Sequence, residues 1–322
     1  PPNPLVPPVT QRRWPVPEAD LTPRLRVASL AMLVGGGRGW WARALACQRT
    51  LRGPVRLTGV ALHSGVDAAA EVLPAPPGTG VVFRVPGRGA QWVDIPASLA
   101  HAGESPRSTS LIQDGHRVDM VEHFLAALYG MGIDNAFVVV TGGEPPALDG
   151  SCQPLVDAIS EVGVEESAAP RRELRLDRPV YVAAGSSHAM AVPGEGLRLS
   201  VGTDFRPPVG RSAVDLVLDP ESFRSELAAA RTPGFIDEWN ALKGAGLALG
   251  ASEDNVLVVL EDDFGVPPRW PDEVGRHKAL DLVGDLALLG ARLHACVITM
   301  MGGHALNRAL VREIQGTVSL VE

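Results

Sequence analysis

Imidazole and carboxylate side chains recur at four-residue spacing in one segment, at His277, Asp281 and Asp285. At about 100° per residue, an α-helix would place all three within roughly 80° on one face. A histidine and a carboxylate at i and i+4 can converge on one ion, and a nitrogen and oxygen donor set without cysteine suits zinc or another borderline divalent metal. Such a stripe is also common as a solvated helix face or an ion pair, and the spacing alone permits either interpretation.

A second polar pair, Glu122-His123, offers a third ligand and a general base. Both residues lie off the apolar stripe of their own segment, at roughly 100° and 200° from Val121 on a helical wheel. Three protein ligands plus one water is the pattern of catalytic zinc sites, and an adjacent glutamate that does not ligate can accept a proton from that water. As a simple polar pair on a helix surface, the two residues would have no chemical role.

A histidine that follows two glycines, His304, is a further candidate. Glycines let the backbone turn sharply and would leave the imidazole at the end of a strand, where sites in layered folds often lie. A lone histidine in a turn is more often structural, so its position is suggestive only beside the other candidates.

Apolar spacing predicts the elements that position these residues. Residues 121–128 carry apolar side chains at i, i+3, i+4 and i+7, which predicts an amphipathic helix, and a buried-strand run follows at residues 136–140. The same order of helix, glycine and apolar strand recurs at residues 277–289, Gly290 and residues 295–300. We therefore expect an α+β fold of two layered domains of similar design, with the charged, Ala/Pro-rich residues 165–172 as their linker.

The composition limits the class of protein. A chain of 322 residues is long enough for about two domains. Lys and Arg total 29 against 37 Asp and Glu, and the formal net charge of −8 disfavours nucleic acid as a partner. The 3 cysteines form no Cys-x-x-Cys pair, which favours a reducing compartment over a disulfide framework. No run approaches the roughly 20 apolar residues of a membrane span, so we expect no transmembrane segment.

The first residues differ from the rest of the chain. They are rich in proline and arginine and contain the pair Trp40-Trp41. We expect residues 1–46 to be an N-terminal extension of unknown role, followed by a first α+β domain at residues 47–166 and a second at residues 167–322. An arginine-rich, acid-poor organellar targeting segment is the alternative for the extension.

Several longer motifs follow one another between Gln48 and the C-terminus. In the first half they are Gln48-Arg49-Thr50-Leu51, Gly59-Val60-Ala61-Leu62-His63-Ser64-Gly65, Val121-Glu122-His123-Phe124-Leu125-Ala126-Ala127-Leu128, Gly132-Ile133-Asp134-Asn135 and Leu148-Asp149-Gly150-Ser151. In the second half they are Ala230-Arg231-Thr232, Gly234-Phe235, His277-Lys278, Leu280-Asp281, Gly284-Asp285-Leu286 and Gly303-His304-Ala305-Leu306-Asn307. Together they resemble the zinc-dependent UDP-3-O-acyl-N-acetylglucosamine deacetylases of lipid A biosynthesis.

The resemblance implies a fold and a metal. Each of two domains would be a β-sheet packed with a pair of helices, similar to domain 2 of ribosomal protein S5, with the active site between the domains. The implied cofactor is Zn2+, held by His123, His277 and Asp281.

The resemblance also implies catalytic roles. Glu122 would be the general base, His304 the general acid and Asp285 the carboxylate that orients and charges His304. Thr232 would bind the oxyanion, with the ammonium of Lys278 nearby. Only two lysines occur in the chain, and one of them stands at this position.

The implied reaction removes the N-acetyl group from UDP-3-O-(3-hydroxyacyl)-N-acetylglucosamine and releases acetate and a free amine. We expect a monomer in the cytoplasm of a Gram-negative type of bacterium, with peripheral proximity to the inner membrane as an option. Pro233 stands where the family usually has an aromatic residue. This departure keeps an alternative open, a divergent non-catalytic protein of the same fold that binds nucleotide sugars or acyl chains.

Two further substrate contacts are expected on weaker grounds. Phe235 would touch the substrate, although a packing role is the alternative. The apolar residues around Leu247 and Leu249 are candidates for the slot of the 3-O-acyl chain, against a simple role in core packing.

Overall fold

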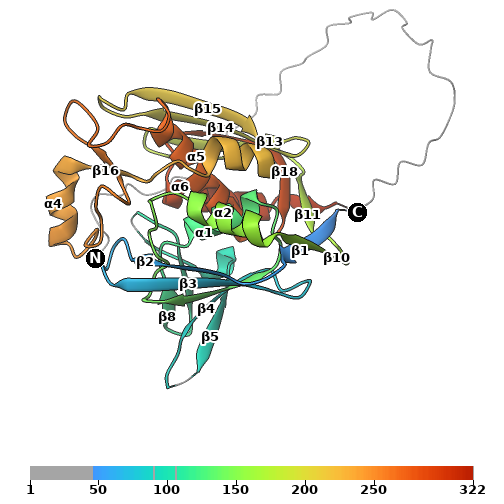
Figure 1. The fold of residues 1–322 in the computed structure, drawn as a ribbon. Coiled ribbons are helices and arrows are strands. Elements are labelled where there is room, and N and C mark those ends of the chain that lie inside the picture. Colours follow the sequence, from blue (N-terminus) through green and yellow to red (C-terminus); the bar gives the residue numbers. More distant parts are fainter. Residues whose placement is uncertain (1–45, 90, 106, 322) are drawn as a thin grey trace, which may run out of the picture.

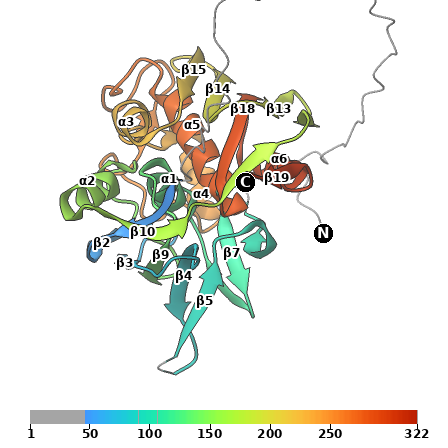
Figure 2. The ribbon, with the colours of Figure 1, turned by 90° about the vertical axis from the view of Figure 1, so that its right-hand side faces the viewer.

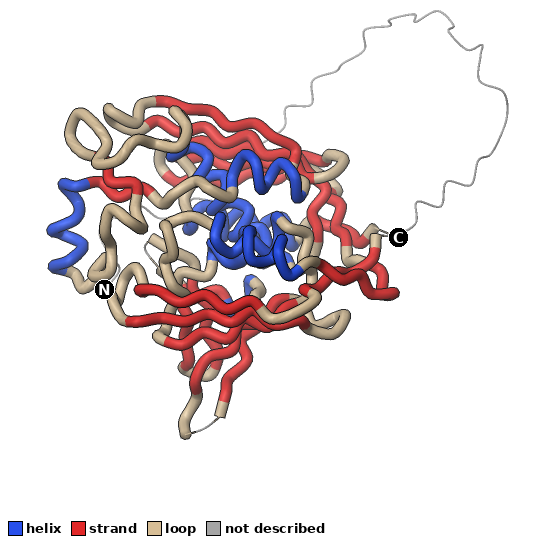
Figure 3. Tube along the Cα trace, in the orientation of Figure 1, coloured by secondary structure: helices blue, strands red, loops and turns tan. Residues whose placement is uncertain are grey.

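The computed structural model describes residues 46–89, 91–105 and 107–321 (Figure 1). Its architecture is mixed α+β, with helices lying between two layers of strands (Figure 3). The strands of one layer come from the first half of the chain and those of the other layer from the second half (Figure 1). The α+β class is therefore confirmed. The expected N-terminal extension lies outside the described residues, apart from Ala46.

The first sheet contains five strands in the order β2-β3-β9-β4-β5, and its neighbours are antiparallel except for the parallel pair β4 and β9. Its strands are β2 (Val55–Val60), β3 (Asp67–Pro74), β4 (Val81–Pro86), β5 (Trp92–Pro96) and β9 (Ala136–Thr141). Along β3, alternate residues are buried, which is the period of a strand with one face on a core. The helices α1 (Glu122–Gly130) and α2 (Gln153–Val162) lie on that side (Figure 1). A small antiparallel sheet of β6 (Ala102–Gly103), β7 (Ser110–Gln113) and β8 (His116–Val118) lies beside it.

The second sheet contains seven strands built around β18 (Arg292–Met300). Strand β18 pairs antiparallel with β13 and parallel with β14 and β11. The other strands are β11 (Glu173–Leu176), β12 (Val180–Ala184), β13 (Ser187–Pro193), β14 (Leu197–Asp204), β15 (Arg211–Val217) and β19 (Val318–Leu320). Its inner face carries α5 (Glu273–Leu286) and α6 (His304–Gln315), so each sheet has a pair of helices, as the resemblance implied.

Shorter elements connect these layers. Between β15 and α5 the chain forms α3 (Pro220–Ser222), the π-helical turn η2 (Phe223–Leu227), β16 (Pro233–Phe235), α4 (Ile236–Gly244) and β17 (Leu257–Val259). Strands β16 and β17 pair in parallel, and α4 lies at the outer end of this connecting segment (Figure 1). The 3-10 turn η1 (Leu99–His101) directly precedes β6, and the 3-10 turn η3 (Ala287–Leu289) directly follows α5.

The expected helix, glycine and strand order is confirmed in both halves, and the segment expected to be a linker forms a strand. Residues 165–172 lie mostly in β10 (Val164–Pro170), which pairs antiparallel with β1 (Cys47–Leu51). Glu165 and Glu166 of this segment are exposed in the two-stranded ribbon, where Arg49 forms an ion pair with Glu166. The backbone N–H and C=O groups of β10 thus bond to a strand more than 100 residues earlier in the chain. No local sequence pattern indicates this pairing.

Helices α1 and α5 lie side by side in the middle of the molecule, as the view turned by 90° also shows (Figure 2). Their close approach depends on Gly284 in α5. A Cβ atom built on Gly284 would lie 2.2 Å from the backbone oxygen of Glu122 in α1, closer than any real contact. Glycine is therefore the residue that fits here, and it brings the start of α1 against the second half of α5.

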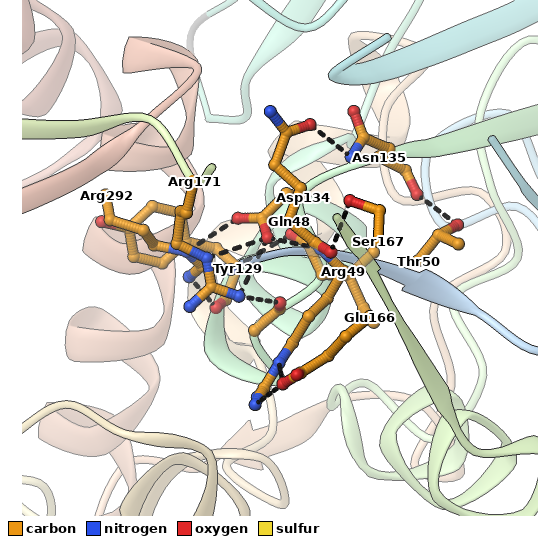
Figure 4. Close-up of polar contacts among 12 residues, drawn as sticks. Gln48, Arg49, Thr50, Tyr129, Asp134, Asn135, Glu166, Ser167, Arg171 and Arg292 are labelled. Carbon is orange, nitrogen blue, oxygen red and sulfur yellow. Dashed lines mark hydrogen bonds and ion pairs between the residues drawn. The ribbon is translucent and has the colours of Figure 1, made fainter. Parts of the chain in front are cut away.

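An ionic cluster around Asp134 connects the two halves beyond the other end of α1 (Figure 4). The Asp134 carboxylate accepts hydrogen bonds from the backbone N–H of Arg49 at 2.8 Å and from the side chain of Arg171 at 2.9 Å. Arg292 of β18 approaches the same carboxylate at 3.3 Å, and its guanidinium stacks over the ring of Tyr129 at 4.2 Å. Strands β1 and β18 and the end of α1 are therefore held together by one partly buried set of charges.

Candidate metal and acid–base site

Three helices supply the chemical groups of the site. Glu122 and His123 occupy the first turn of α1, and His304 is the first residue of α6. The predicted face of α5 carries His277, Asp281 and Asp285, all buried rather than solvated. Because α1 packs against α5 through Gly284, groups about 150 residues apart in the sequence lie in one place.

His123, His277 and Asp281 form a group that could hold a metal ion. One ligand atom from each residue lies within 4.8 Å of the others. The Nε2 atoms of His277 and His123 are 3.3 Å and 3.7 Å from Oδ1 of Asp281. The two imidazole rings meet edge to face at 5.0 Å. Two neutral nitrogens and one carboxylate oxygen are the donors that a borderline divalent ion prefers.

The hydrogen bonding of Asp281 shows whether this group suits a metal ion. Its Oδ1 atom is buried and has no hydrogen-bond partner in the described part of the chain, a situation that costs free energy unless something else binds the oxygen. Its Oδ2 atom accepts a hydrogen bond from Nζ of Lys278 at 2.8 Å. Burial would raise the pKa of Asp281, but His277 and Lys278 outweigh it and hold this pKa well below its ordinary value. Asp281 is thus an anion with one free oxygen directed at the two histidines.

His123 and His277 have lowered pKa values, so both are neutral and able to bind a metal ion. Burial, followed by the neighbouring His277, lowers the pKa of His123 to about 3, and burial also lowers the pKa of His277. The Nδ1 atom of His277 lies 3.0 Å from the carbonyl oxygen of Ala230. That contact places the proton on Nδ1 and leaves Nε2 as an acceptor facing Asp281, which is the usual outer contact of a ligating histidine.

Glu122 and His304 face each other beside this group. Nε2 of His304 lies 3.7 Å from Oε1 of Glu122 and 3.8 Å from Oδ2 of Asp281. Burial raises the pKa of Glu122 to about 7, although the nearby His304 opposes the shift. Burial would lower the pKa of His304, but Asp285, Asp281 and Glu122 together raise it to about 9. The site therefore pairs a carboxylate that titrates near neutrality with an imidazolium.

Asp285 is hydrogen-bonded to His304. Oδ2 of Asp285 accepts hydrogen bonds from Nδ1 of His304 and from Nδ2 of Asn307, both at 2.9 Å. Its other oxygen accepts a hydrogen bond from the hydroxyl of Thr109. Asp285 is fully buried, and these contacts hold its carboxylate in one position.

A cavity of about 270 Å³ opens onto these groups. Its reactive wall contains Glu122, His123, His277, Asp281 and His304 together with Lys278 and Thr232. Its apolar wall is formed by side chains from both halves of the chain, namely Leu62, Met120, Trp239, Leu242, Ala248 and Val256. The candidate residues are therefore brought to one cavity.

The remaining candidates differ in their placement. Phe235 and Pro233 line the cavity, and the ring of Phe235 lies 5.7 Å from that of Phe205. Leu247 and Leu249 do not line it, and Leu249 is exposed. Ala248 between them, with a left-handed backbone (φ of 53°), does line the cavity. Of the segment expected to form the acyl slot, only Ala248 therefore lines the cavity.

Comparison with known proteins decides the family. The model of the UDP-3-O-acyl N-acetylglycosamine deacetylase family matches residues 48–316. A protein of Solibacter usitatus named UDP-3-O-acyl-N-acetylglucosamine deacetylase is 42% identical over 278 residues, which cover 85% of this chain and 93% of that protein. Proteins of the same name from Saccharophagus degradans and Marinobacter nauticus are each 41% identical and share 83% of this chain, covering 89% and 90% of their own lengths. The chain belongs to this deacetylase family.

Membership of the deacetylase family confirms the resemblance stated from the motifs and the expected enzyme class, a deacetylase of UDP-3-O-acyl-N-acetylglucosamine in lipid A biosynthesis. Neither the family nor these relatives support the alternative of a non-catalytic binding protein. Of the helices in the described residues, none combines the length and apolar character needed to cross a membrane.

Sequence reasoning missed several residues of the site. Asn307 lies three residues after His304 on α6, and this i, i+3 spacing could have indicated a shared face. Thr109 and the carbonyl of Ala230 gave no such signal, because a threonine in a loop and a backbone oxygen have no distinctive pattern.

Proposed function

We propose that this chain hydrolyses the acetamide of UDP-3-O-(3-hydroxyacyl)-N-acetylglucosamine in the cavity between α1, α5 and α6, and that His123, His277 and Asp281 hold Zn2+ there. One observation carries the proposal: a buried carboxylate oxygen of Asp281 without a partner faces two neutral histidines, directly beside a Glu122–His304 pair. When bound, such an ion supplies Lewis acidity, which lowers the pKa of water and polarises a carbonyl oxygen.

Glu122 is proposed as the general base. Its Oε2 atom is held by the backbone N–H of Thr109 at 2.9 Å, so Oε1 is the oxygen left to accept a proton from the attacking water. A pKa of about 7 lets the carboxylate take that proton near neutral pH and release it again. The water oxygen attacks the acetyl carbon while its proton passes to Glu122.

His304 is proposed as the general acid. Asp285 binds its Nδ1 atom at 2.9 Å, so the proton on Nε2 is the one directed into the cavity. An amide nitrogen leaves poorly unless it is protonated, and an imidazolium with a raised pKa is charged at neutral pH. Transfer of that proton to the nitrogen allows the C–N bond to break, giving acetate and the free amine.

Lys278 and Thr232 are proposed to stabilise the negative charge on the acetyl oxygen. Both line the cavity. Within the described residues, the hydroxyl of Thr232 has no hydrogen-bond partner. The backbone of Thr232 is fixed by its N–H to Gly150 and by its carbonyl to Leu257, each at 2.8 Å. A fixed donor directed at a developing charge needs no reorganisation during the reaction.

The apolar wall of the cavity is proposed to take the 3-O-acyl chain. Trp239 and Leu242 of α4 face Leu62 and Met120 of the first half there, and Phe235 lies at the same wall. An acyl chain packed against these side chains would be removed from contact with water, which favours binding.

The organisation and location of the chain are proposed on more general grounds. We propose two domains, at residues 47–166 and 167–322, and a monomeric protein of the bacterial cytoplasm. The cysteines of the described residues are free, which supports a reducing compartment.

The proposal is tested by metal analysis together with acetate release. The purified wild type should hold one zinc ion and release acetate from the UDP-linked acylated substrate, and His277→Ala should lose both. Arg198→Ala, which breaks an exposed ion pair on the second sheet, is the control that should keep both the zinc ion and acetate release. One zinc ion per chain without acetate release by the wild type would contradict the proposed activity.

A further inference from the structure

Thr109 lies between the base and the acid of the proposed reaction. It is the residue before β7, and none of its surface is exposed to solvent. Its backbone forms two hydrogen bonds to the start of α1. The N–H of Thr109 donates to Oε2 of Glu122 at 2.9 Å, and its carbonyl accepts from the N–H of Val121 at 3.1 Å. The Glu122 carboxylate is thereby fixed at one oxygen.

The side chain of Thr109 reaches the other partner of the pair. Its hydroxyl donates to Oδ1 of Asp285 and lies 3.3 Å from Nδ1 of His304. Since an ionised carboxylate only accepts hydrogen bonds, the hydroxyl must be the donor to Asp285. Asp285 then offers its second oxygen to His304 and Asn307.

The hydroxyl oxygen is itself held in place. Nη1 of Arg308 lies 3.4 Å from Oγ1 of Thr109 and 3.2 Å from the carbonyl oxygen of Ser108. Because the oxygen accepts from Arg308, its own proton is directed to Asp285. One residue thus contacts α1 through its backbone, α5 through its hydroxyl donor and α6 through its acceptor.

We propose that Thr109 is a positioning residue, whose hydroxyl sets the orientation of the Asp285–His304 pair relative to Glu122. This inference rests on the proposed function. Thr109 does not line the cavity, so it acts through Asp285 rather than on the substrate. The acid and the base must reach different atoms of one amide, the nitrogen and the attacking water, and small errors in such geometry reduce the rate strongly.

A packing role would make a different set of predictions. Valine has nearly the shape of threonine but no hydroxyl, whereas serine keeps the hydroxyl and loses a methyl group. If Thr109 only fills space, Thr109→Val should be tolerated and Thr109→Ser should be harmful. If the hydroxyl positions Asp285, the order reverses.

The test compares kcat, KM, zinc content and melting temperature of Thr109→Val and Thr109→Ser in the metal-loaded enzyme. We expect Thr109→Val to lower kcat about 10- to 100-fold, the usual effect of losing a hydrogen bond that orients a functional side chain. KM and zinc content should stay close to the wild type. Thr109→Ser should recover most of kcat. Thr317→Val is the matched control, because it removes a buried hydroxyl bond at the far end of α6 and should leave kcat unchanged.

A double-mutant cycle separates positioning from general destabilisation. If Thr109 acts through Asp285, Thr109→Val should cost almost nothing further in an Asp285→Ala background, whereas independent effects would add. Wild-type kcat in Thr109→Val, no recovery in Thr109→Ser, or additive losses would each overturn the positioning role while the proposed function stood. A wild type that releases no acetate would overturn both.

Discussion

Gly284 of α5 lies against the backbone carbonyl of Glu122 in α1, and a Cβ atom at Gly284 would lie 2.2 Å from that oxygen. The two halves of the site, Glu122-His123 on one helix and His277, Asp281 and Asp285 on the other, meet because this position carries no side chain. The geometry of the site therefore depends on a residue that has no side chain.

Gly284→Ala should therefore damage stability and activity together. Forcing a methyl group into this contact must move α1 from α5, and overpacking of this kind costs about 1–3 kcal/mol of unfolding free energy. Because Glu122 moves with the contact, kcat should also fall. Denaturant unfolding and acetate release measure the two effects. Gly316→Ala is the control, since its nearest neighbour lies at 3.7 Å and it should have little effect on either. Gly284→Ala with wild-type stability would show that the helices are not held this closely.

Metal binding should stabilise the fold through Asp281. The partnerless Oδ1 atom of Asp281 gains a partner when an ion binds, so zinc should raise the melting temperature of the chelator-treated protein. At a free ion concentration 100 times Kd, the linkage amounts to about 2.7 kcal/mol. Calorimetry of the wild type and Asp281→Ala, with and without zinc, measures the shift. A shift of equal size in Asp281→Ala would remove this residue from the ligand set.

The rate should follow a bell-shaped pH profile. Glu122 must be ionised to accept a proton, so kcat/KM should fall as pH drops below its pKa of about 7. His304 must be protonated to donate, so kcat/KM should fall as pH rises above its pKa of about 9. The two groups face each other, so the observed values belong to the pair, and a bound cation moves both limbs to lower pH. His304→Ala should lose the alkaline limb, and an unchanged alkaline limb in that variant would refute its role as the acid.

The ion pair of Arg231 and Glu273 should be essential for the fold around Thr232. Glu273 is fully buried and accepts from the backbone and the guanidinium of Arg231 at 2.8–3.0 Å. Arg231→Ala would leave that buried carboxylate without its cationic partner, held only by the backbone N–H groups of residues 231 and 269, and breaking a buried ion pair costs about 3–5 kcal/mol of unfolding free energy. Arg198→Ala removes an exposed ion pair, which is worth at most about 1 kcal/mol. Equal losses in denaturant unfolding of the two variants would contradict this reading.

Local periodicity was enough to predict part of this structure. The apolar stripe of residues 121–128 predicted α1, and the four-residue spacing of His277, Asp281 and Asp285 predicted one helical face, because both signals lie within a few turns. The spacing could not decide between a solvated face and a buried site. That distinction depends on α1, which packs there only through tertiary contacts.

Long-range contacts explain what the sequence did not predict. The hydroxyl of Thr109 binds a carboxylate 176 residues away, and no pattern near Thr109 marks it. Residues 165–172 have the composition of a linker, yet β10 forms there because β1 offers its backbone groups. Composition describes a segment alone, whereas strand pairing depends on a partner distant in the sequence.

The most direct measurement of the central claim is acetate release by Glu122→Gln with its metal content determined in the same sample. Glutamine keeps the size of Glu122 and can accept the hydrogen bond from Thr109, but it cannot take a proton from water. The account predicts that Glu122→Gln binds zinc as the wild type does, melts at a similar temperature and loses at least about 100-fold in kcat. A zinc-loaded Glu122→Gln variant that releases acetate at the wild-type rate would contradict the account.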